Sequence, residues 1–243
     1  MSYALYEDLE GLRFWRQSEL LLRRRIRDAL VETVSTTLLD LNQMWAFEEI
    51  ETPPMMPRDR MSAAYDRSDV FMLQDAPGGT SDWALRAETT DGTYATAAQI
   101  LRSTRMRPPL CVWQMGQSFR RETSDGATAA KLRLNAFVQL EMQCIHALDT
   151  KADIATAVRD ALVPVVERIT GLPTRLLQQT ERVPSYSSET VDVECLLPNG
   201  EWREVASTSK RLDFPEIPGQ RPCTVFEVAF GADRMTALAQ GTL

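Results

Sequence analysis

The chain has 243 residues, of which 44% are hydrophobic and 25% charged, a composition typical of globular rather than disordered proteins. Its formal net charge of −7 argues against a surface devoted to nucleic acid, because such surfaces carry a basic surplus. Contact with RNA would therefore need a local patch, from residues 23–27 or from Arg102, Arg105 and Arg107, although a solvated helix face explains each group more simply.

A long amphipathic helix is predicted over residues 14–43, because apolar residues recur there at three- or four-residue steps. Residues 47–54 then predict a short strand that proline ends, since proline lacks the N–H that a central strand needs. The polar segment 57–82 indicates a long surface loop, and loops of this length are often functional. The apolar face of the helix consists of Leu22, Ile26, Leu30, Val34, Leu38 and Leu41.

The rest of the chain predicts further helices, separated by strands that hairpins connect. In chain order we expect ordered structure to resume at 83–86, followed by a helix at 92–104 and two strands at 110–119 and 135–148 that flank a wide loop at 123–130. A second helix is expected at 153–169, where Pro164 could kink it and Gly171 ends it. Three strands at 191–197, 202–207 and 224–229 and a final helix from about Asp233 complete the chain.

This order of elements favours an α+β fold, an antiparallel β-sheet flanked by helices, over alternating parallel βαβ units. Because no repeat, low-complexity tract or Gly/Ser linker interrupts the chain, we expect residues 1–243 to form a single domain.

The four cysteines have no CxxC spacing, and the chain has a single histidine, so a zinc site is not expected. Apolar, strand-like surroundings predict buried free thiols in a reducing compartment. The sequence shows neither a signal peptide nor an apolar run long enough to span a bilayer. We therefore expect a cytoplasmic protein with neither a membrane nor DNA as a partner. The cysteines are Cys111, Cys144, Cys195 and Cys223.

The first candidate for chemistry is the segment Phe119-Arg120-Arg121-Glu122, at the end of a predicted strand. Arg120 and Glu122 lie two residues apart, so in an extended chain their side chains project from the same face. Arg120 could hold a phosphate bidentately, and Phe137 on the returning strand could stack on a base. The alternatives are a surface ion pair, which contributes little, and an ordinary core aromatic.

Two further groups carry suitable side chains. Arg234 stands at the start of the last predicted helix, whose N-terminus favours anions, and could clamp a phosphate. The hairpin at 191–207 carries acidic residues and a serine, including Glu204 and Ser207, whose oxygens suit Mg²⁺. A surface arginine and a solvated strand face are the alternatives.

Together these segments resemble motifs 2 and 3 of the class II aminoacyl-tRNA synthetases. Residues 119–141 match Phe-Arg-x-Glu, a loop, Arg-x-x-x-Phe and a glutamate four residues on, and residues 231–234 match Gly-x-Asp-Arg. The predicted first helix with residues 49–53 resembles the degenerate motif 1, which builds the dimer interface in the family. The resemblance runs from about residue 15 to the C-terminus and implies a subclass IIa catalytic core over the whole chain, without an anticodon-binding domain.

Within the family the chain looks most like the glycyl enzymes. Residues 85–92, Leu-Arg-Ala-Glu-Thr-Thr-Asp-Gly, resemble their Leu-Arg-Pro-Glu-Thr-Ala-Gln-Gly, in which the glutamate grips the substrate ammonium. Residues 226–231 resemble their Glu-Pro-Ser-Phe-Gly. The resemblance therefore implies that Glu88 and Glu227 contact the ammonium and that Arg86 belongs to the amino acid site.

The match departs from the glycyl pattern at several positions. Val228 replaces a proline, Ala229 replaces a serine that contacts glycine, and Asn135-Ala136 stand in place of Arg-Glu. Residues 191–207 resemble seryl and prolyl enzymes at least as well, and in seryl enzymes the residues that match Glu204 and Ser207 bind the metal. Glycine is thus the first candidate substrate, followed by serine, alanine, threonine or proline.

The resemblance implies a homodimer that uses ATP and Mg²⁺ to convert an amino acid into its adenylate and then transfers the aminoacyl group to a tRNA acceptor end. Arg120 and Arg234 would neutralise phosphates, Phe137 would stack on adenine, and Glu122 would read its amino group. Two alternatives remain: a paralogue that acylates a carrier protein, a small molecule or a protein side chain, and an inactive core that serves as a binding or regulatory subunit.

Overall fold

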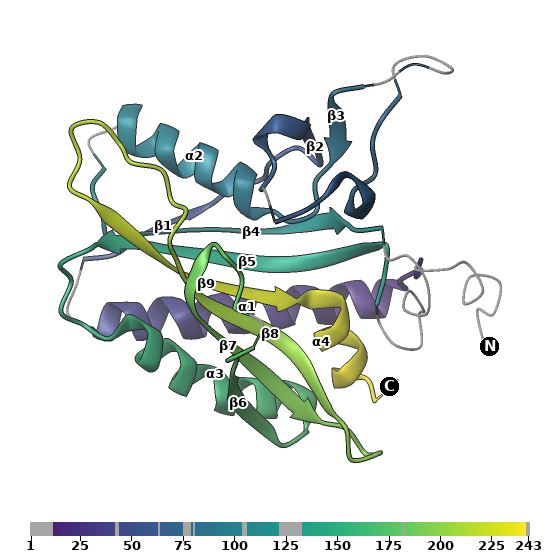
Figure 1. The fold of residues 1–243 in the computed structure, drawn as a ribbon. Coiled ribbons are helices and arrows are strands. Elements are labelled where there is room, and N and C mark those ends of the chain that lie inside the picture. Colours follow the sequence, from purple (N-terminus) through teal and green to yellow (C-terminus); the bar gives the residue numbers. More distant parts are fainter. Residues whose placement is uncertain are drawn as a thin grey trace.

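The computed structural model describes residues 12–41, 44–62, 64–74, 79, 81–103, 106–121, 133–181 and 183–241. They form a seven-stranded sheet with α2 on one side and α1 and α3 on the other (Figure 1). The helices are α1 (Gln17–Asp40), α2 (Thr90–Ser103), α3 (Ile154–Thr170) and α4 (Ala232–Ala239). The strands are β1 (Ala46–Glu49), β2 (Met55–Pro57), β3 (Trp83–Leu85), β4 (Leu110–Phe119), β5 (Ala136–Ala147), β6 (Thr174–Gln178), β7 (Ser187–Leu196), β8 (Trp202–Arg211) and β9 (Cys223–Gly231).

The strand order of the large sheet is β1-β4-β5-β9-β8-β7-β6. Every neighbouring pair is antiparallel except β1 and β4, which run parallel. The α+β fold with an antiparallel sheet flanked by helices is therefore confirmed, with one correction at this edge. The two strands run in the same direction because the segment between them, which includes α2, returns the chain to the end of the sheet at which β1 began.

The central strands are buried on both faces, and alternation along each strand divides its side chains between two cores. In β4, Cys111 and Trp113 pack with α1 and α3, whereas Leu110 and Val112 pack with α2. The apolar stripe predicted on the first helix is confirmed: Ile26, Leu30, Val34 and Leu38 are buried in the first core, and Leu22 and Leu41 are partly buried against it.

Local signals explain the ends of α3. The Asp153 side chain accepts a hydrogen bond from the backbone N–H of Thr156 at 3.1 Å, which caps the N-terminus. Gly171 ends the helix in the left-handed conformation, with φ 69°, as its position in the sequence indicated. Pro164 lies inside the helix.

The segment 57–82 differs from the predicted surface loop. Its described residues include two short 3-10 helices, η1 (Arg58–Arg60) and η2 (Arg67–Asp69), beside the small β2–β3 sheet. A third apolar cluster, Met61, Val70, Ala84 and Ala87, holds this segment together. The sequence did not reveal this cluster, because its members stand far apart in a segment that is otherwise polar.

Two further corrections concern the strands. The edge strand β6 was not predicted, because residues 174–178 alternate too little and remain partly exposed. Both β7 and β8 extend beyond their predicted bounds through serine, threonine and charged residues. The loop predicted at 123–130 lies outside the described residues.

All four cysteines are free, and Cys111, Cys144 and Cys195 are buried, as predicted. In the part of the chain that the structure describes, no helix is both long and apolar enough to cross a membrane.

The Asp233 carboxylate ties three elements together at the start of α4. Its Oδ1 accepts a hydrogen bond from Arg23 Nη1 of α1 at 2.6 Å, and its Oδ2 accepts one from the Val138 N–H of β5 at 2.9 Å. The two charged side chains are only 13% and 5% exposed. Arg23 is thus engaged inside the protein and does not contribute to a basic surface patch.

We expect Asp233→Ala to lower the free energy of unfolding by about 3–5 kcal/mol, because it leaves the Arg23 charge and the Val138 N–H without their partner. Urea denaturation of the purified variant measures this change. Arg24→Ala, which alters an exposed neighbour on α1, is the matched control and should change stability little. A loss below about 1 kcal/mol in Asp233→Ala would contradict the anchoring role.

Candidate active site

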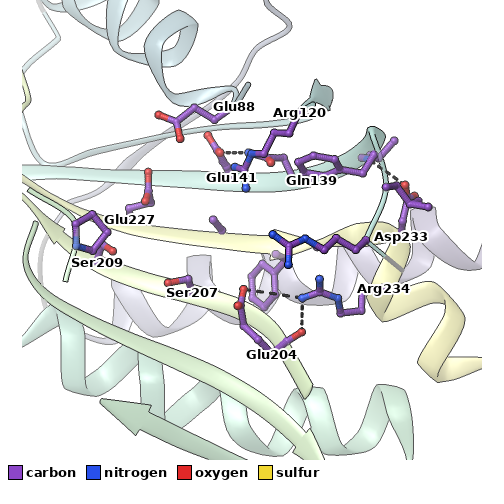
Figure 2. Close-up of a pocket in the computed structure, with 18 of the residues that line it drawn as sticks. Glu88, Arg120, Gln139, Glu141, Glu204, Ser207, Ser209, Glu227, Asp233 and Arg234 are labelled. Carbon is purple, nitrogen blue, oxygen red and sulfur yellow. Dashed lines mark hydrogen bonds and ion pairs between the residues drawn. The ribbon is translucent and has the colours of Figure 1, made fainter. Parts of the chain in front are cut away.

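A cavity of about 460 Å³ opens over β5, β9 and β8, on the face of the sheet that α2 partly covers. Strand alternation explains its chemistry. On β5, Gln139 and Glu141 point into the cavity. The alternate residues Leu140 and Met142 point to the other face of the sheet and pack in the core with α1 and α3. Charged side chains from several elements converge on it (Figure 2).

Three carboxylates form a cluster in the cavity, defined here as the glutamate cluster: Glu88, Glu141 and Glu227. They are 5%, 2% and 6% exposed. The Thr90 hydroxyl lies 2.9 Å from Glu141 Oε2 and 3.2 Å from Glu227 Oε2 and thus bridges the two. Gln143 donates to Glu227 Oε2 at 2.7 Å.

One guanidinium contacts the cluster among the described residues. Arg211 Nη1 donates to Glu227 Oε1 at 3.2 Å, while Nη2 donates to Asp213 at 2.8 Å. The Arg211 guanidinium is buried and lies 3.8 Å from the centre of the Tyr186 ring. A single guanidinium contact therefore serves three buried carboxylates, so the cluster favours protonated carboxyl groups when no cation is bound.

Burial and the mutual repulsion of the three carboxylates raise the proton affinity of the cluster. Burial, and then the neighbouring Glu141 charge, raises the pKa of Glu88 to about 8. Burial, and then Glu227, raises the pKa of Glu141 to about 7. Glu88 Oε1 is buried and has no hydrogen-bond partner in the described structure. A cationic group with several N–H donors, such as an ammonium, would favour the ionised carboxylates and fill their acceptor oxygens.

Arg120 leaves the end of β4 and enters the same cavity. Its Nε donates to the Ala87 carbonyl at 3.1 Å, and its guanidinium carbon lies 5.3 Å from the Tyr65 ring centre and 5.2 Å from that of Phe137. Burial lowers the pKa of Arg120, but Coulombic interactions with Tyr65 and with the carboxyl groups of Glu88 and Glu141 outweigh burial and raise it. The guanidinium thus stays charged.

Arg234 stands in the first turn of α4 and lines the same cavity. Its Nη1 donates to the Glu204 carbonyl at 2.6 Å and lies 4.0 Å from Glu204 Oε1 (Figure 2). Burial lowers the pKa of Arg234, yet a guanidinium remains protonated in proteins. Arg120 and Arg234, together with Arg133, thus place guanidinium groups from separate parts of the chain beside the cluster of carboxylates.

A β-bulge brings Glu204 and Ser207 to the cavity together. Residues three apart on a regular strand face opposite sides, but Glu204 pairs with Glu194 while Ala206 pairs with the preceding residue of β7, so Val205 is extra. Val205 and Ala206 are both buried in the core with α1 and α3. The bulge therefore shifts the alternation and turns Glu204 and Ser207 to the same side.

These two oxygen-bearing side chains fit a Mg²⁺ ion that takes its other ligands from phosphate and water. Neither Asp192 nor Glu194 lines the cavity: Asp192 binds Gln179, and Glu194 pairs with Arg175 at 2.7 Å. Within the described ranges, no group of three or more His, Cys, Asp or Glu could hold a metal. A metal here would therefore depend on substrate oxygens.

Arg86, which the resemblance places in the amino acid site, does not line the cavity. It lies beneath the site and donates to the carbonyls of Thr52 and Gln117, both at 2.7 Å, and of Pro53 at 3.3 Å. A Cβ on Gly116 would come within 2.4 Å of Arg86 Nη2, so the glycine makes room for this brace. Arg86 thus joins the segment that carries Glu88 to the backbone of Thr52, Pro53 and Gln117.

The remaining predicted site residues divide clearly. Phe137, Glu88, Glu227, Arg120, Arg234, Glu204 and Ser207 all line the cavity, whereas Glu122 lies outside the described residues. Sequence reasoning assigned no role to Glu141, Tyr65 or Arg211. Glu141 carried a signal, because it ends the segment 119–141, but Tyr65 and Arg211 stand in segments without a recognisable pattern.

No family model matches the chain. Among curated proteins it is similar to glycine--tRNA ligases: 27% identical over 173 residues to that of Lachnoclostridium phytofermentans, covering 63% of this chain and 37% of the relative, and 26% identical over 213 residues to that of Rhodopirellula baltica, covering 84% and 38%. The chain thus spans less than half the length of these relatives.

Solved structures show the same fold. The prolyl-tRNA synthetase of Giardia lamblia, in complex with prolyl-adenylate, superposes with a TM-score of 0.70 at 14% identity, covering 96% of this chain and 48% of that one. The prolyl-tRNA synthetase of Cryptosporidium parvum, complexed with halofuginone and AMPPNP, gives a TM-score of 0.71 at 13% identity and the same coverages.

The glutamate cluster predicts a pH dependence of stability. Because the folded protein holds protons on Glu88 and Glu141 above their ordinary pKa, this stabilisation is full at low pH and is lost as pH rises through about 7 and about 8. We expect the melting temperature of the ligand-free protein to fall by several degrees across this range. Glu88→Gln should flatten the decline, and the exposed Glu216→Gln should not. A decline of equal size in both variants would contradict the assignment.

Proposed function

We propose that this chain, which has the core fold of a class II aminoacyl-tRNA synthetase, uses ATP to activate a small amino acid as its aminoacyl-adenylate. One observation carries the proposal: a single cavity holds three buried carboxyl groups beside several arginines, among them Arg120 and Arg234. The zwitterionic amino acid and the polyphosphate of ATP present the complementary charges.

The glutamate cluster would receive the ammonium group. Its three carboxylates can each accept one of the three ammonium N–H donors, and Glu88 Oε1 is already without a partner in the described structure. With the ammonium bound there, the substrate carboxylate would face Arg120, which lies near Tyr65 and Phe137 in the same cavity. Because this carboxylate is ionised, it can attack the α-phosphorus without a general base.

The arginines would stabilise the charge that builds on the phosphoryl oxygens as pyrophosphate leaves. Arg120 is held between two aromatic rings, and Arg234 is held by the Glu204 carbonyl, so both are fixed before the substrate arrives. Phe137 lines the cavity as a platform for adenine, and Glu122 remains the proposed reader of its amino group. Glu204 and Ser207 would hold Mg²⁺, which neutralises phosphate charge when bound.

The names of the relatives support the choice of substrate and acceptor. Glycine comes first because the curated relatives are glycine--tRNA ligases, with serine, alanine, threonine and proline next. Because these relatives are tRNA ligases, the acceptor end of tRNA is the first candidate acceptor of the aminoacyl group. We further infer a homodimer through α1 and β1, the elements that resemble motif 1. The retained arginines and carboxylates speak against an inactive core.

Amino-acid-dependent ATP–pyrophosphate exchange, run with each of the twenty amino acids, tests the proposal. We expect exchange with one small amino acid and a loss of about 10³-fold or more in Arg120→Ala, since a fixed arginine at a transferring phosphoryl group is worth 10³–10⁵. Charging of tRNA with the same amino acid then tests the acceptor.

Arg168→Ala, an exposed arginine on α3, is the matched control and should keep wild-type exchange. Thermal melts establish that each variant is folded. Wild-type exchange in folded Arg120→Ala would refute the assignment, and no exchange with any amino acid would refute the proposed reaction.

A separate prediction concerns the metal. Glu204→Ala should raise the Mg²⁺ concentration needed for half-maximal exchange by roughly 10–100-fold, the range typical for residues that support a metal site. Chelation by EDTA should abolish exchange, and excess Mg²⁺ should restore it. Glu216→Ala, which removes an exposed carboxylate elsewhere, should leave the requirement unchanged. An unchanged requirement in Glu204→Ala would remove Glu204 from the metal site.

A further inference from the structure

Tyr65 contacts both charged halves of the cavity at once. It lies between η1 and η2, in the segment that the sequence predicted to be a surface loop. Its hydroxyl donates to Glu88 Oε2 at 2.8 Å, and its ring lies 5.3 Å from the Arg120 guanidinium carbon. We infer that Tyr65 is a positioning residue that sets Glu88 for the amino acid through its hydroxyl and Arg120 for the phosphates through its ring. The inference rests on the proposed function.

The hydroxyl determines which oxygen of Glu88 is available. A phenol has one proton to donate, and here it is given to Oε2, so Oε1 remains without a partner in the described structure. Burial, and then Glu88, raises the pKa of Tyr65 well above its ordinary value, so the phenol stays protonated and remains a donor. Glu88 is thereby held with one oxygen occupied and the other directed to an incoming N–H.

The ring acts on Arg120 in a different way. The guanidinium lies near two rings, Tyr65 at 5.3 Å and Phe137 at 5.2 Å, both within the distance at which a cation is attracted to an aromatic face. Its Nε is engaged by the Ala87 carbonyl. Its two terminal nitrogens make no hydrogen bond to any described residue. The rings thus hold the guanidinium in the cavity by cation–π attraction, and its terminal donors are available to an anion.

The segment around Tyr65 is built to hold it in place. Tyr65 packs against the apolar cluster of Met61, Val70, Ala84 and Ala87. The Tyr65 carbonyl accepts a hydrogen bond from Arg58 Nη2, and the backbone N–H of Ser62 donates to Asp91 Oδ2 at 2.9 Å. The Arg121 N–H donates to the Asp69 carbonyl at 2.9 Å, which joins the segment to the end of β4. These contacts explain why this polar stretch is ordered.

Two variants separate the two roles. Tyr65→Phe removes only the hydroxyl, so the KM for the amino acid should rise about 10-fold or more, as expected for loss of a hydrogen bond to a charged group, while the KM for ATP stays unchanged. Tyr65→Leu also removes the ring, so the KM for ATP should rise and kcat should fall in addition. Trp83→Phe, an exposed aromatic on β3 of the same segment, is the matched control.

A pH profile separates positioning from a merely structural role. Glu88 is faced by Tyr65, by Glu141 and Glu227 of the sheet, by Arg211 of β8 and by Asp91 of α2. Because the phenol hydrogen bond favours the ionised form of Glu88, its loss should move the acid limb of kcat/KM to higher pH in Tyr65→Phe. The Trp83→Phe profile should match that of the wild type.

The assay is ATP–pyrophosphate exchange with glycine, or with whichever of the twenty amino acids supports exchange in the wild type. A raised KM for the amino acid alone and a shifted acid limb in Tyr65→Phe establish the inference. Wild-type kinetics in Tyr65→Phe, or an equal rise of both KM values, overturn it while the proposed function stands. No exchange by the wild type with any amino acid overturns both.

Discussion

Buried negative charge is the constraint on which the cavity depends. Three glutamates lie beneath the surface with one guanidinium in contact, and an ionised carboxylate is costly to bury unless donors surround it. The protein meets this cost with a threonine hydroxyl from α2, a glutamine from β5, an arginine from β8 and a tyrosine from the segment after β2. In the described structure Glu88 Oε1 is still without a donor, so the cluster can accept a hydrogen bond from a bound cation.

The elements that the sequence predicted well are those whose side chains follow a period. The apolar stripe of α1 and the ten residues of β4 carry that signal, and the structure has both within a few residues of the expected bounds. The edge strand β6 and the β2–β3 region carry none, because their order depends on contacts between residues distant in the chain. Polarity alone made segment 57–82 resemble an exposed loop.

The site shows the same division. The residues that carry the family resemblance, such as Arg120 and Glu227, do meet in one cavity. The resemblance placed Arg86 in the amino acid site, but its guanidinium donates to the backbone around Thr52 and does not line the cavity. No spacing in the sequence reveals that Arg211 donates a hydrogen bond to Glu227, or that the extra residue of the β-bulge in β8 turns Glu204 toward the cavity. These depend on strand register, which emerges only when the sheet assembles.

The tether between Arg23 and Asp233 gives α1 a mechanical importance that its distance from the glutamates would not suggest. Asp233 and Arg234 are consecutive residues at the start of α4, and the first of them is bound to α1 at 2.6 Å while the second enters the cavity. A change in the position of the first helix would therefore act, through one carboxylate, on the residue next to the Arg234 guanidinium. The longest helix of the described chain is thus coupled by a single ion pair to the element that carries a cavity arginine.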